Sequence, residues 1–180
     1  MIIQDQRDRP LRALRISVTD RCNFRCIYCM PREKYKQYAY LKQSEVLTFE
    51  EIHRLVKIFM QLGVRKVRIT GGEPLVRRDI EQLIRFLSQN PELDLSMTTN
   101  GSFPVERVHK LKEAGLTRIT VSIDSLDDAI YKKMNDVNKS VEHTLRWIEE
   151  CEKVGLSPIK INCVIKRGIN EHGILPLVDQ

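Results

Sequence analysis

The sequence feature that most constrains the fold is a junction that occurs three times: a helix-like pattern ends at a glycine, and a Val or Leu then begins a strand-like pattern. The three glycines are Gly63, Gly115 and Gly155. Glycine is favoured just beyond a helix because it adopts left-handed backbone angles without strain. Helices and strands that alternate through such short connections are typical of parallel β/α units. The chain is therefore predicted to be an α/β protein with a parallel sheet.

The expected elements follow from hydrophobic periodicity along the chain. Thr48 and Glu51 form a capping-box signature at the start of the first long helix, which ends before Gly63. Further helices are expected at residues 80–87, 105–111 and 141–151 and near residue 172. Residues 1–10 are expected to be a flexible lead-in, and residues 20–46 one long functional loop. Strands are expected at residues 11–19, 64–70, 93–99, 117–123 and 159–164.

The predicted strands have one apolar and one polar face, because apolar and polar residues alternate along each of them. Parallel strands covered by helices on both faces are apolar throughout, and a closed barrel of eight such strands has an apolar interior. An antiparallel sheet with one solvated face fits poorly with the intervening helices. We therefore predict an incomplete parallel (β/α) barrel of the TIM type with about five β/α units. Its concave face would line a wet cavity, and residues 1–180 would form a single domain.

Composition narrows the class of partner. The chain has 180 residues and a formal net charge of +6, which favours an anionic partner. Its basic residues are scattered and not interleaved with aromatic residues, so nucleic acid is not expected. No apolar run has membrane-spanning length, and the first residues lack the apolar core of a signal peptide. We expect a cytoplasmic protein without a membrane partner and with a small anionic ligand.

Three of the five cysteines lie within eight residues: Cys22, Cys26 and Cys29, with the spacing C-x3-C-x2-C. Thiolates are the ligands of soft metal centres, and three of them leave one coordination position of a four-ligand site open. Structural zinc would want a fourth ligand nearby, and disulfides would suit a small secreted domain. An open metal cluster is favoured over structural zinc on this basis. Cys151 and Cys163 fall on apolar faces and are expected in the core.

This cysteine run, with Tyr28 before its last cysteine, resembles the cluster motif of the radical S-adenosylmethionine (SAM) enzymes. The wider run from Leu14 to Cys26, with Tyr28-Cys29-Met30-Pro31, is similar to the GTP 3′,8-cyclase family of molybdenum cofactor biosynthesis. Members of that family are lyases that convert GTP to (8S)-3′,8-cyclo-7,8-dihydroguanosine 5′-triphosphate. The resemblance implies a barrel of the radical SAM type and a mechanism in which an electron from a reduced 4Fe–4S cluster splits SAM. The resulting radical would take the 3′ hydrogen of GTP.

The resemblance also implies roles for individual residues. The turn Thr70-Gly71-Gly72-Glu73-Pro74 matches the GGEP motif that contacts the SAM methionine in the family. By spacing alone such a turn is a weak signal, because paired glycines serve equally well at an ordinary strand end. The implied cluster ligands are Cys22, Cys26 and Cys29, and the implied SAM-binding residues are Tyr28, Gly72 and Ser122.

Three cations fall on the predicted polar face: Arg15, Arg68 and Lys160. A buried cation is costly without an anion, so three of them in one cavity imply a polyanionic substrate. Internal pairing with Glu73 or Asp124 is the alternative, and it could neutralise two of the three. The resemblance assigns GTP binding to Arg15, Arg68, Thr98 and Lys160.

The family also implies partners beyond SAM and GTP. They are an electron donor such as flavodoxin or ferredoxin, the downstream cyclic pyranopterin monophosphate synthase, and in longer relatives a second 4Fe–4S cluster and possible homodimerisation. The chain lacks the later region of those relatives, so we expect it to be an N-terminal part that binds one cluster without completing GTP cyclisation. Two alternatives stay open at this point: another radical SAM enzyme of the peptide-modifying type, and a zinc-holding binding module.

Overall fold

In the computed structural model, which describes residues 3–179, five parallel strands form one sheet in the order of the chain, β1-β2-β3-β4-β5. Every neighbouring pair is parallel, so each connection between strands crosses over through helical structure. All five predicted strands are present, each shorter than expected at one or both ends. Their bounds are Ala13–Ser17 for β1, Lys66–Thr70 for β2, Asp94–Thr99 for β3, Arg118–Ser122 for β4 and Ile159–Asn162 for β5.

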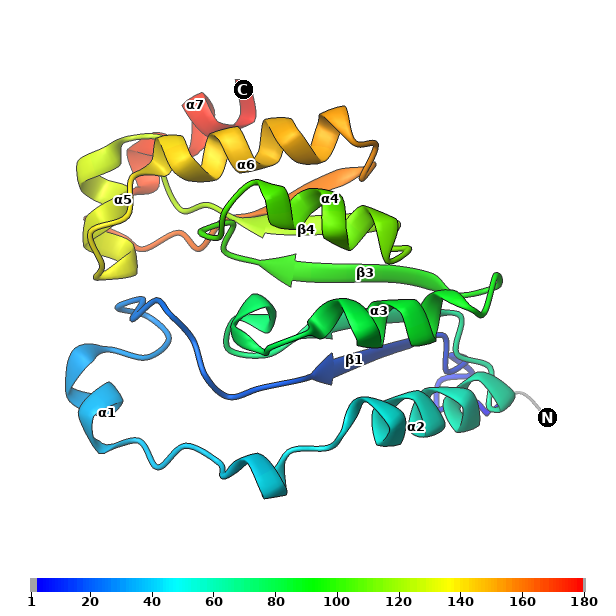
Figure 1. The fold of residues 1–180 in the computed structure, drawn as a ribbon. Coiled ribbons are helices and arrows are strands. Elements are labelled where there is room, and N and C mark those ends of the chain that lie inside the picture. The colour runs from blue at the N-terminus through cyan, green and yellow to red at the C-terminus, as the bar shows by residue number, and fades with distance from the viewer. Residues whose placement is uncertain (1–2, 180) are drawn as a thin grey trace.

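Four long helices cover one face of this sheet (Figure 1). They are α2 (Phe49–Gln61), α3 (Ile80–Ser88), α4 (Glu106–Glu113) and α6 (Val141–Lys153). The predicted capping box is present: Thr48 accepts the backbone N–H of Glu51, and Glu51 accepts that of Thr48. The three junction glycines have φ values of +111°, +99° and +73°, as helix-terminating glycines do. A last short helix, α7, runs from Ile174 to Asp179.

The hydrophobic core lies between these helices and the apolar face of the sheet. Helix α6 contributes Trp147 and Cys151, both fully buried, so Cys151 is a core residue as predicted. Each buried aliphatic side chain stabilises the fold by roughly 1.5–3 kcal/mol, and their spacing along each strand places them on the helix side. The strand residues of this core include Val67, Ile69, Leu95, Met97, Ile119 and Val121.

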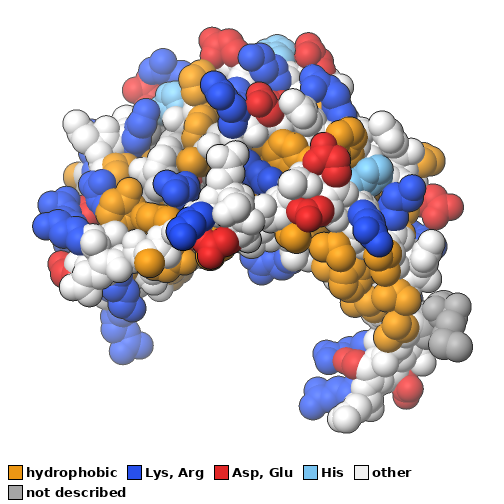
Figure 2. All heavy atoms as spheres, turned by 60° about the horizontal axis from the view of Figure 1, so that its bottom comes forward, with side chains coloured by type: hydrophobic (Ala, Val, Ile, Leu, Met, Phe, Trp, Pro, Cys, Tyr) orange, Lys and Arg blue, Asp and Glu red, His pale blue; other side chains and the backbone are white. Residues whose placement is uncertain are grey.

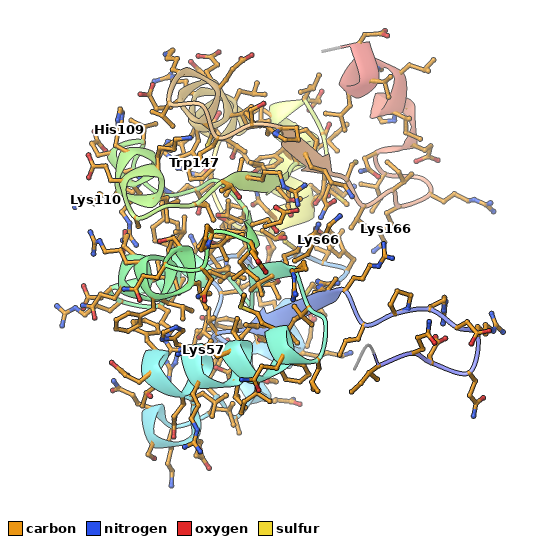
Figure 3. The ribbon with its side chains drawn as sticks, turned by 90° about the vertical axis from the view of Figure 1, so that its right-hand side faces the viewer. Lys57, Lys66, His109, Lys110, Trp147 and Lys166 are labelled. Carbon is orange, nitrogen blue, oxygen red and sulfur yellow. The ribbon has the colours of Figure 1, made fainter. Side chains whose placement is uncertain are left out.

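The opposite face of the sheet is polar and open, as predicted. Figure 2 shows the molecule as an arch with a hollow on its lower side and Lys and Arg side chains beside it. Lys66 and Lys166 lie on this open side of the sheet, whereas Lys57, His109 and Lys110 stand on the helical side (Figure 3). Edge strands β1 and β5 are at opposite ends of the strand order, so the barrel is incomplete.

Two helical segments interrupt the loop predicted at residues 20–46, which is therefore not one continuous loop. Helix α1 spans Arg32–Gln37, and a 3-10 turn, η1, spans Gln43–Glu45. Neither contains a buried residue, which explains why neither has a hydrophobic pattern in the sequence. Helix α5 (Asp128–Asn135) was also missed; its buried side chains are Tyr131, Met134 and Asn135, and the polar Asn135 breaks the apolar pattern of the buried face.

The lead-in forms a small loop whose ends pair at Gln4 and Pro10. Asp5 holds it by accepting the backbone N–H groups of Arg7 and Arg9. The part of the predicted lead-in at residues 1 and 2 lies outside the described residues. Within the described part of the chain, no helix combines the length and apolarity needed to cross a membrane.

Candidate functional site

A cavity of about 160 Å³ lies at the carboxyl ends of β2, β3 and β4, where the cysteine loop passes over the sheet. Ligand sites of parallel α/β sheets are expected at this end of the strands. The cavity brings together all three clustered cysteines, all three predicted SAM-binding residues and Thr98. Its lining residues are Cys22, Phe24, Cys26, Tyr28, Cys29, Thr70, Gly72, Glu73, Thr98, Thr99, Asn100 and Ser122.

The cysteine loop is held in place by its own turn and by helix α5. The backbone N–H of Cys29 donates to the carbonyl of Cys26 at 2.9 Å, which closes a tight turn between two of the thiols. The N–H groups of Arg25 and Ile27 donate to carbonyls at the end of α5, at 3.1 and 3.0 Å. Helix α5, which was not predicted from the sequence, therefore holds the cysteine loop in place through two backbone hydrogen bonds.

All three thiols are free, with Cys29 exposed and Cys22 and Cys26 half-buried. Burial raises the pKa of Cys22 to about 11 and that of Cys26 to about 12. Metal ligation needs thiolates, so binding of a metal centre here would displace protons from both sulfurs.

The donor set fits an iron–sulfur cluster. Among residues 3–179, no group of three or more His, Cys, Asp or Glu side chains is arranged to hold a metal ion. A 4Fe–4S cluster takes its thiolates on separate iron atoms, so its ligands need only face one cavity. Cys22, Cys26 and Cys29 do so.

Tyr28 is held by a buried carboxyl group. Its hydroxyl donates to Oδ2 of Asp124 at 2.8 Å, while Oδ1 of Asp124 accepts the backbone N–H of Val164 at 2.9 Å. Burial raises the pKa of Asp124. The carboxyl therefore orients the tyrosine at the cavity wall instead of pairing with a cation.

The glycines after β2 are required by close contact with the cysteine loop. A Cβ on Gly72 would lie 2.3 Å from the carbonyl oxygen of Arg21, and one on Gly71 would lie 2.6 Å from that of Thr19. The N–H of Gly72 donates to the Thr19 carbonyl at 2.7 Å. The close approach expected from paired glycines is thus made to the chain itself, and it fixes one cavity wall against the other.

Glu73 is 1% exposed and is bound entirely by neutral groups. Its carboxyl accepts the Thr99 hydroxyl at 2.8 Å and the N–H groups of Asn100 and Leu75 at 2.7 and 3.1 Å. Burial raises the pKa of Glu73 to about 7, and these hydrogen bonds oppose the shift. The alternative in which Glu73 neutralises a cation of the polar face is wrong.

Arg15, Arg68 and Lys160 do share the open face of the sheet. Arg15 and Arg68 are register partners on β1 and β2, and Lys160 is the register partner of Thr120. None of the three makes a salt bridge within residues 3–179. Arg15 and Lys160 are exposed and Arg68 is half-buried, so these cations are not buried charges that require an anion. They remain three cations without a salt bridge that share the open face of the sheet.

One charged residue on this face, Arg118, was not among the residues predicted from the sequence. Arg118 forms an ion pair with Asp94 at the same face, with Nε donating to Oδ1 at 2.8 Å. The alternation of polar and apolar residues that placed Arg68 on the polar face also holds for Arg118 on β4. It could therefore have identified Arg118 as a residue of that face. The predicted site residue Thr98 carries a buried hydroxyl oxygen that has no hydrogen-bond partner among residues 3–179. Cys163, which was expected in the core, is half-buried and belongs to neither hydrophobic cluster; its thiol lies 3.6 Å from the carbonyl oxygen of Asp124.

Comparison with known proteins places the chain in a family that agrees with the cysteine motif and the fold. Residues 16–180 match the model of the Radical SAM superfamily. GTP 3',8-cyclase of Acidothermus cellulolyticus is 48% identical over 174 residues, which are 96% of this chain and 48% of that protein. GTP 3',8-cyclase of a Staphylococcus aureus strain is 45% identical over 179 residues, 98% of this chain and 52% of that protein. The chain thus spans about half the length of the curated relatives it matches.

Solved structures with low sequence identity share the fold. SuiB of Streptococcus suis bound to S-adenosylmethionine superposes with a TM-score of 0.76 at 21% identity, over 93% of this chain and 37% of SuiB. Methylornithine synthase (PylB) superposes with a TM-score of 0.67 at 17% identity, over 93% of this chain and 50% of that protein. The fold of this chain therefore corresponds to a part of each of these longer proteins.

Proposed function

Because the chain belongs to the radical SAM superfamily, we propose that it performs the cluster, SAM and GTP binding of a GTP 3′,8-cyclase. The observation that carries the proposal is that the predicted cluster and SAM residues and the predicted GTP residues lie on one side of the same sheet. The three thiols and the predicted SAM-binding residues share a cavity, and the unpaired cations lie on the open sheet face that leads to it. The high identity to cyclases from two bacteria supports the choice of substrate.

In this proposal Cys22, Cys26 and Cys29 hold a single 4Fe–4S cluster by three iron–thiolate bonds. When bound, the cluster and SAM supply radical chemistry at the ribose of the substrate. Tyr28, oriented by Asp124, would form one wall of the SAM pocket. The wall opposite the cysteines would be formed by Gly72 and Ser122.

The substrate would lie on the open face of the sheet, with its triphosphate against Arg15, Arg68 and Lys160. Guanidinium groups bind phosphate oxygens by paired, charge-assisted hydrogen bonds, which suits two adjacent arginines. Thr98 would use its unpartnered hydroxyl on the same ligand, since a buried polar group without a partner is costly. The chain would thus bind the two reactants at adjoining ends of one surface.

The proposal extends to partners and location. The reductant would be an acidic one-electron carrier such as flavodoxin or ferredoxin, because exposed Cys29 lies close to the basic helix α1. The product would pass to cyclic pyranopterin monophosphate synthase. A second cluster and a homodimer, as in longer relatives, would use residues other than those of this cavity. Five free cysteines and an oxygen-sensitive cluster both suit the reducing cytoplasm.

Anaerobic reconstitution with iron and sulfide tests the proposal. The expected result is a brown 4Fe–4S protein, and Cys26→Ala should lose the cluster because it removes one of three ligands. Cys163→Ala is the matched control, since this half-buried cysteine lies outside the cavity, and it should keep the chromophore. Reduction with dithionite in the presence of SAM should then yield 5′-deoxyadenosine, and GTP should increase the yield more than guanosine does. A colourless zinc protein, or a chromophore unaffected in Cys26→Ala, would contradict the proposal.

A further inference from the structure

Three side chains beside the cavity form a closed ring of hydrogen bonds. The amide nitrogen of Asn23 donates to the hydroxyl of Ser102 at 2.7 Å. That hydroxyl donates to Oδ1 of Asn100 at 2.7 Å, and Nδ2 of Asn100 donates back to Oδ1 of Asn23 at 2.9 Å. Each of the three side chains accepts one hydrogen bond of the ring and donates the next, so all three bonds run in the same direction. Hydrogen bonds arranged in this way polarise and strengthen one another.

The ring joins two separate loops, and a backbone hydrogen bond connects it to a third. Asn23 lies between Cys22 and Phe24 on the cysteine loop, and Asn100 and Ser102 follow β3. The backbone N–H of Asn100 also donates to Oε2 of Glu73, on the loop after β2 that carries Gly72. The ring therefore connects the first thiol, by a continuous path of short contacts, to the loop that forms the opposite cavity wall.

The three members of the ring differ in solvent exposure, and this difference indicates that the ring positions the cysteine loop. Asn100 and Ser102 are 8% and 6% exposed, so their geometry is set by the surrounding protein. Asn23 is exposed and lies over them, held by the ring through both atoms of its amide. An exposed side chain adds little to the hydrophobic core, so this asparagine contributes chiefly through those two bonds.

We propose that the ring of Asn23, Asn100 and Ser102 is a positioning device that fixes Cys22 relative to the loop of Gly72 and Glu73. It would set the distance between the cluster and SAM. Asn23 and Ser102 lie outside the cavity lining, and Asn100 is part of that lining. The inference rests on the proposed function, since the groups that it positions are the proposed cluster ligand and SAM-binding loop. The backbone N–H of Phe24 donates to Sγ of Cys22 at 3.4 Å, so movement of Asn23 would also disturb a hydrogen bond to the ligand sulfur.

The test uses Asn23→Ala, Ser102→Ala and the double variant of the 180-residue chain after reconstitution. Each single variant should keep its cluster but bind SAM about tenfold more weakly, because the ring is broken. The double variant should bind no more weakly than either single one, since a ring can be broken only once. Ser102→Thr keeps the hydroxyl and should restore binding. Asn90→Ala, which removes a comparable amide bond to the Leu87 carbonyl away from the cavity, should bind SAM normally.

Two further measurements separate positioning from general stability. Addition of SAM should change the electron paramagnetic resonance spectrum of the reduced wild-type cluster, and this change should be lost or reduced in Asn23→Ala. In the metal-free chain, hydrogen exchange of residues 22–29 should be faster in Asn23→Ala and unchanged in Asn90→Ala. Wild-type exchange rates and wild-type SAM affinity in Asn23→Ala would overturn the inference while leaving the proposed function intact. Failure of the wild-type chain to assemble a cluster would instead refute the proposed function, and the exchange measurement would still decide whether the ring holds the loop.

Discussion

At the scale of single residues, the two buried acids of the site position neighbouring groups. Asp124 accepts the Tyr28 hydroxyl, and Glu73 accepts three neutral donors from the loops around the cavity. A carboxylate stabilised only by neutral donors retains much of its desolvation cost. Glu73 should therefore make the stability of the chain depend on pH.

The first prediction concerns Glu73→Gln. The pKa of Glu73 is about 7 in the folded chain and 4.5 when the group is not perturbed, so the folded state holds the proton more tightly. Its contribution to stability is then fully present below the unfolded value and is lost as pH rises through the folded value. Between about pH 5 and about pH 8 the wild-type free energy of unfolding should fall by on the order of 3 kcal/mol more than that of the variant.

Urea unfolding at several pH values measures this difference. The exposed Glu113→Gln is the control, and it should follow the wild-type pH dependence because Glu113 lies at the surface. The absolute stability of Glu73→Gln is not the quantity tested, since the amide also disturbs three hydrogen bonds. Equal slopes for Glu73→Gln and wild type would show that Glu73 titrates in the folded chain as it does when unfolded.

At the scale of the elements, the loops after the strands hold one another through backbone contacts. The second prediction is that Gly72→Ala separates the loop after β2 from the cysteine loop, because its Cβ would lie 2.3 Å from the Arg21 carbonyl oxygen. We expect a loss of stability of about 2 kcal/mol or more, in the range of other overpacked sites, and a weakened cluster. Thermal unfolding and iron content measure both effects.

Gly173→Ala is the matched control for this change. A Cβ at Gly173 would meet nothing closer than the Ser125 hydroxyl at 3.7 Å, and its φ is not positive. The control should therefore unfold at the wild-type temperature and bind the same amount of iron. A Gly72→Ala chain with wild-type stability would mean that the two loops separate at no cost.

The third prediction concerns helix α5 as a support for the cysteine loop. Asp127 caps this helix by accepting the backbone N–H of Ile130 at 3.0 Å, and loss of a cap costs about 1 kcal/mol. In Asp127→Ala the backbone N–H groups of Arg25 and Ile27 should exchange about fivefold faster, because their acceptors lie at the end of that helix.

Thr48→Ala removes the corresponding cap of α2, which lies away from the cysteine loop, and is the control. It should destabilise the chain by a similar amount without changing exchange at Arg25 and Ile27. Equal exchange rates at these two residues in both variants would show that α5 does not support the loop.

Most of the helices and strands, but not all of them, could be predicted from the sequence. The long helices and all five strands were predictable, because each has a full period of apolar residues that pack into one core. Helices α1 and α5 were not, since α1 buries nothing and the buried face of α5 includes the polar Asn135. At the site, the cysteines and cations were identified by motif and alternation. The Asn23 ring was not, because single polar residues on separate loops carry no pattern until the fold brings them together.

At the scale of the whole molecule, the sheet has two chemically different faces. The helical face is sealed by a core of aliphatic side chains and Trp147, whereas the open face is hollow and carries unpaired cations (Figure 2). A hollow in which charges of one sign outnumber those of the other attracts ions of the opposite sign, so this face should attract anions. The position of a cation relative to the sheet, and not the net charge of the chain, should therefore decide its effect on nucleotide binding.

The last prediction compares Arg68→Gln with Lys57→Gln. Arg68 lies on the open face beside Arg15, and Lys57 stands on the helical side of the sheet, on α2 (Figure 3). Each change lowers the net charge by one, so any effect of overall charge should be the same in both variants. Loss of a charge-assisted hydrogen bond to phosphate costs about 1.5–3 kcal/mol, so Arg68→Gln should bind GTP at least about tenfold more weakly.

Equilibrium binding of labelled GTP at several salt concentrations measures the effect. Wild-type affinity should fall as salt increases, because the exposed cations Arg15 and Lys160 are screened, and the fall should be shallower in Arg68→Gln. Lys57→Gln should match wild type in affinity and in salt dependence. Equal weakening in both variants would show that GTP responds to the net charge of the molecule, and the open face would then not be the triphosphate site.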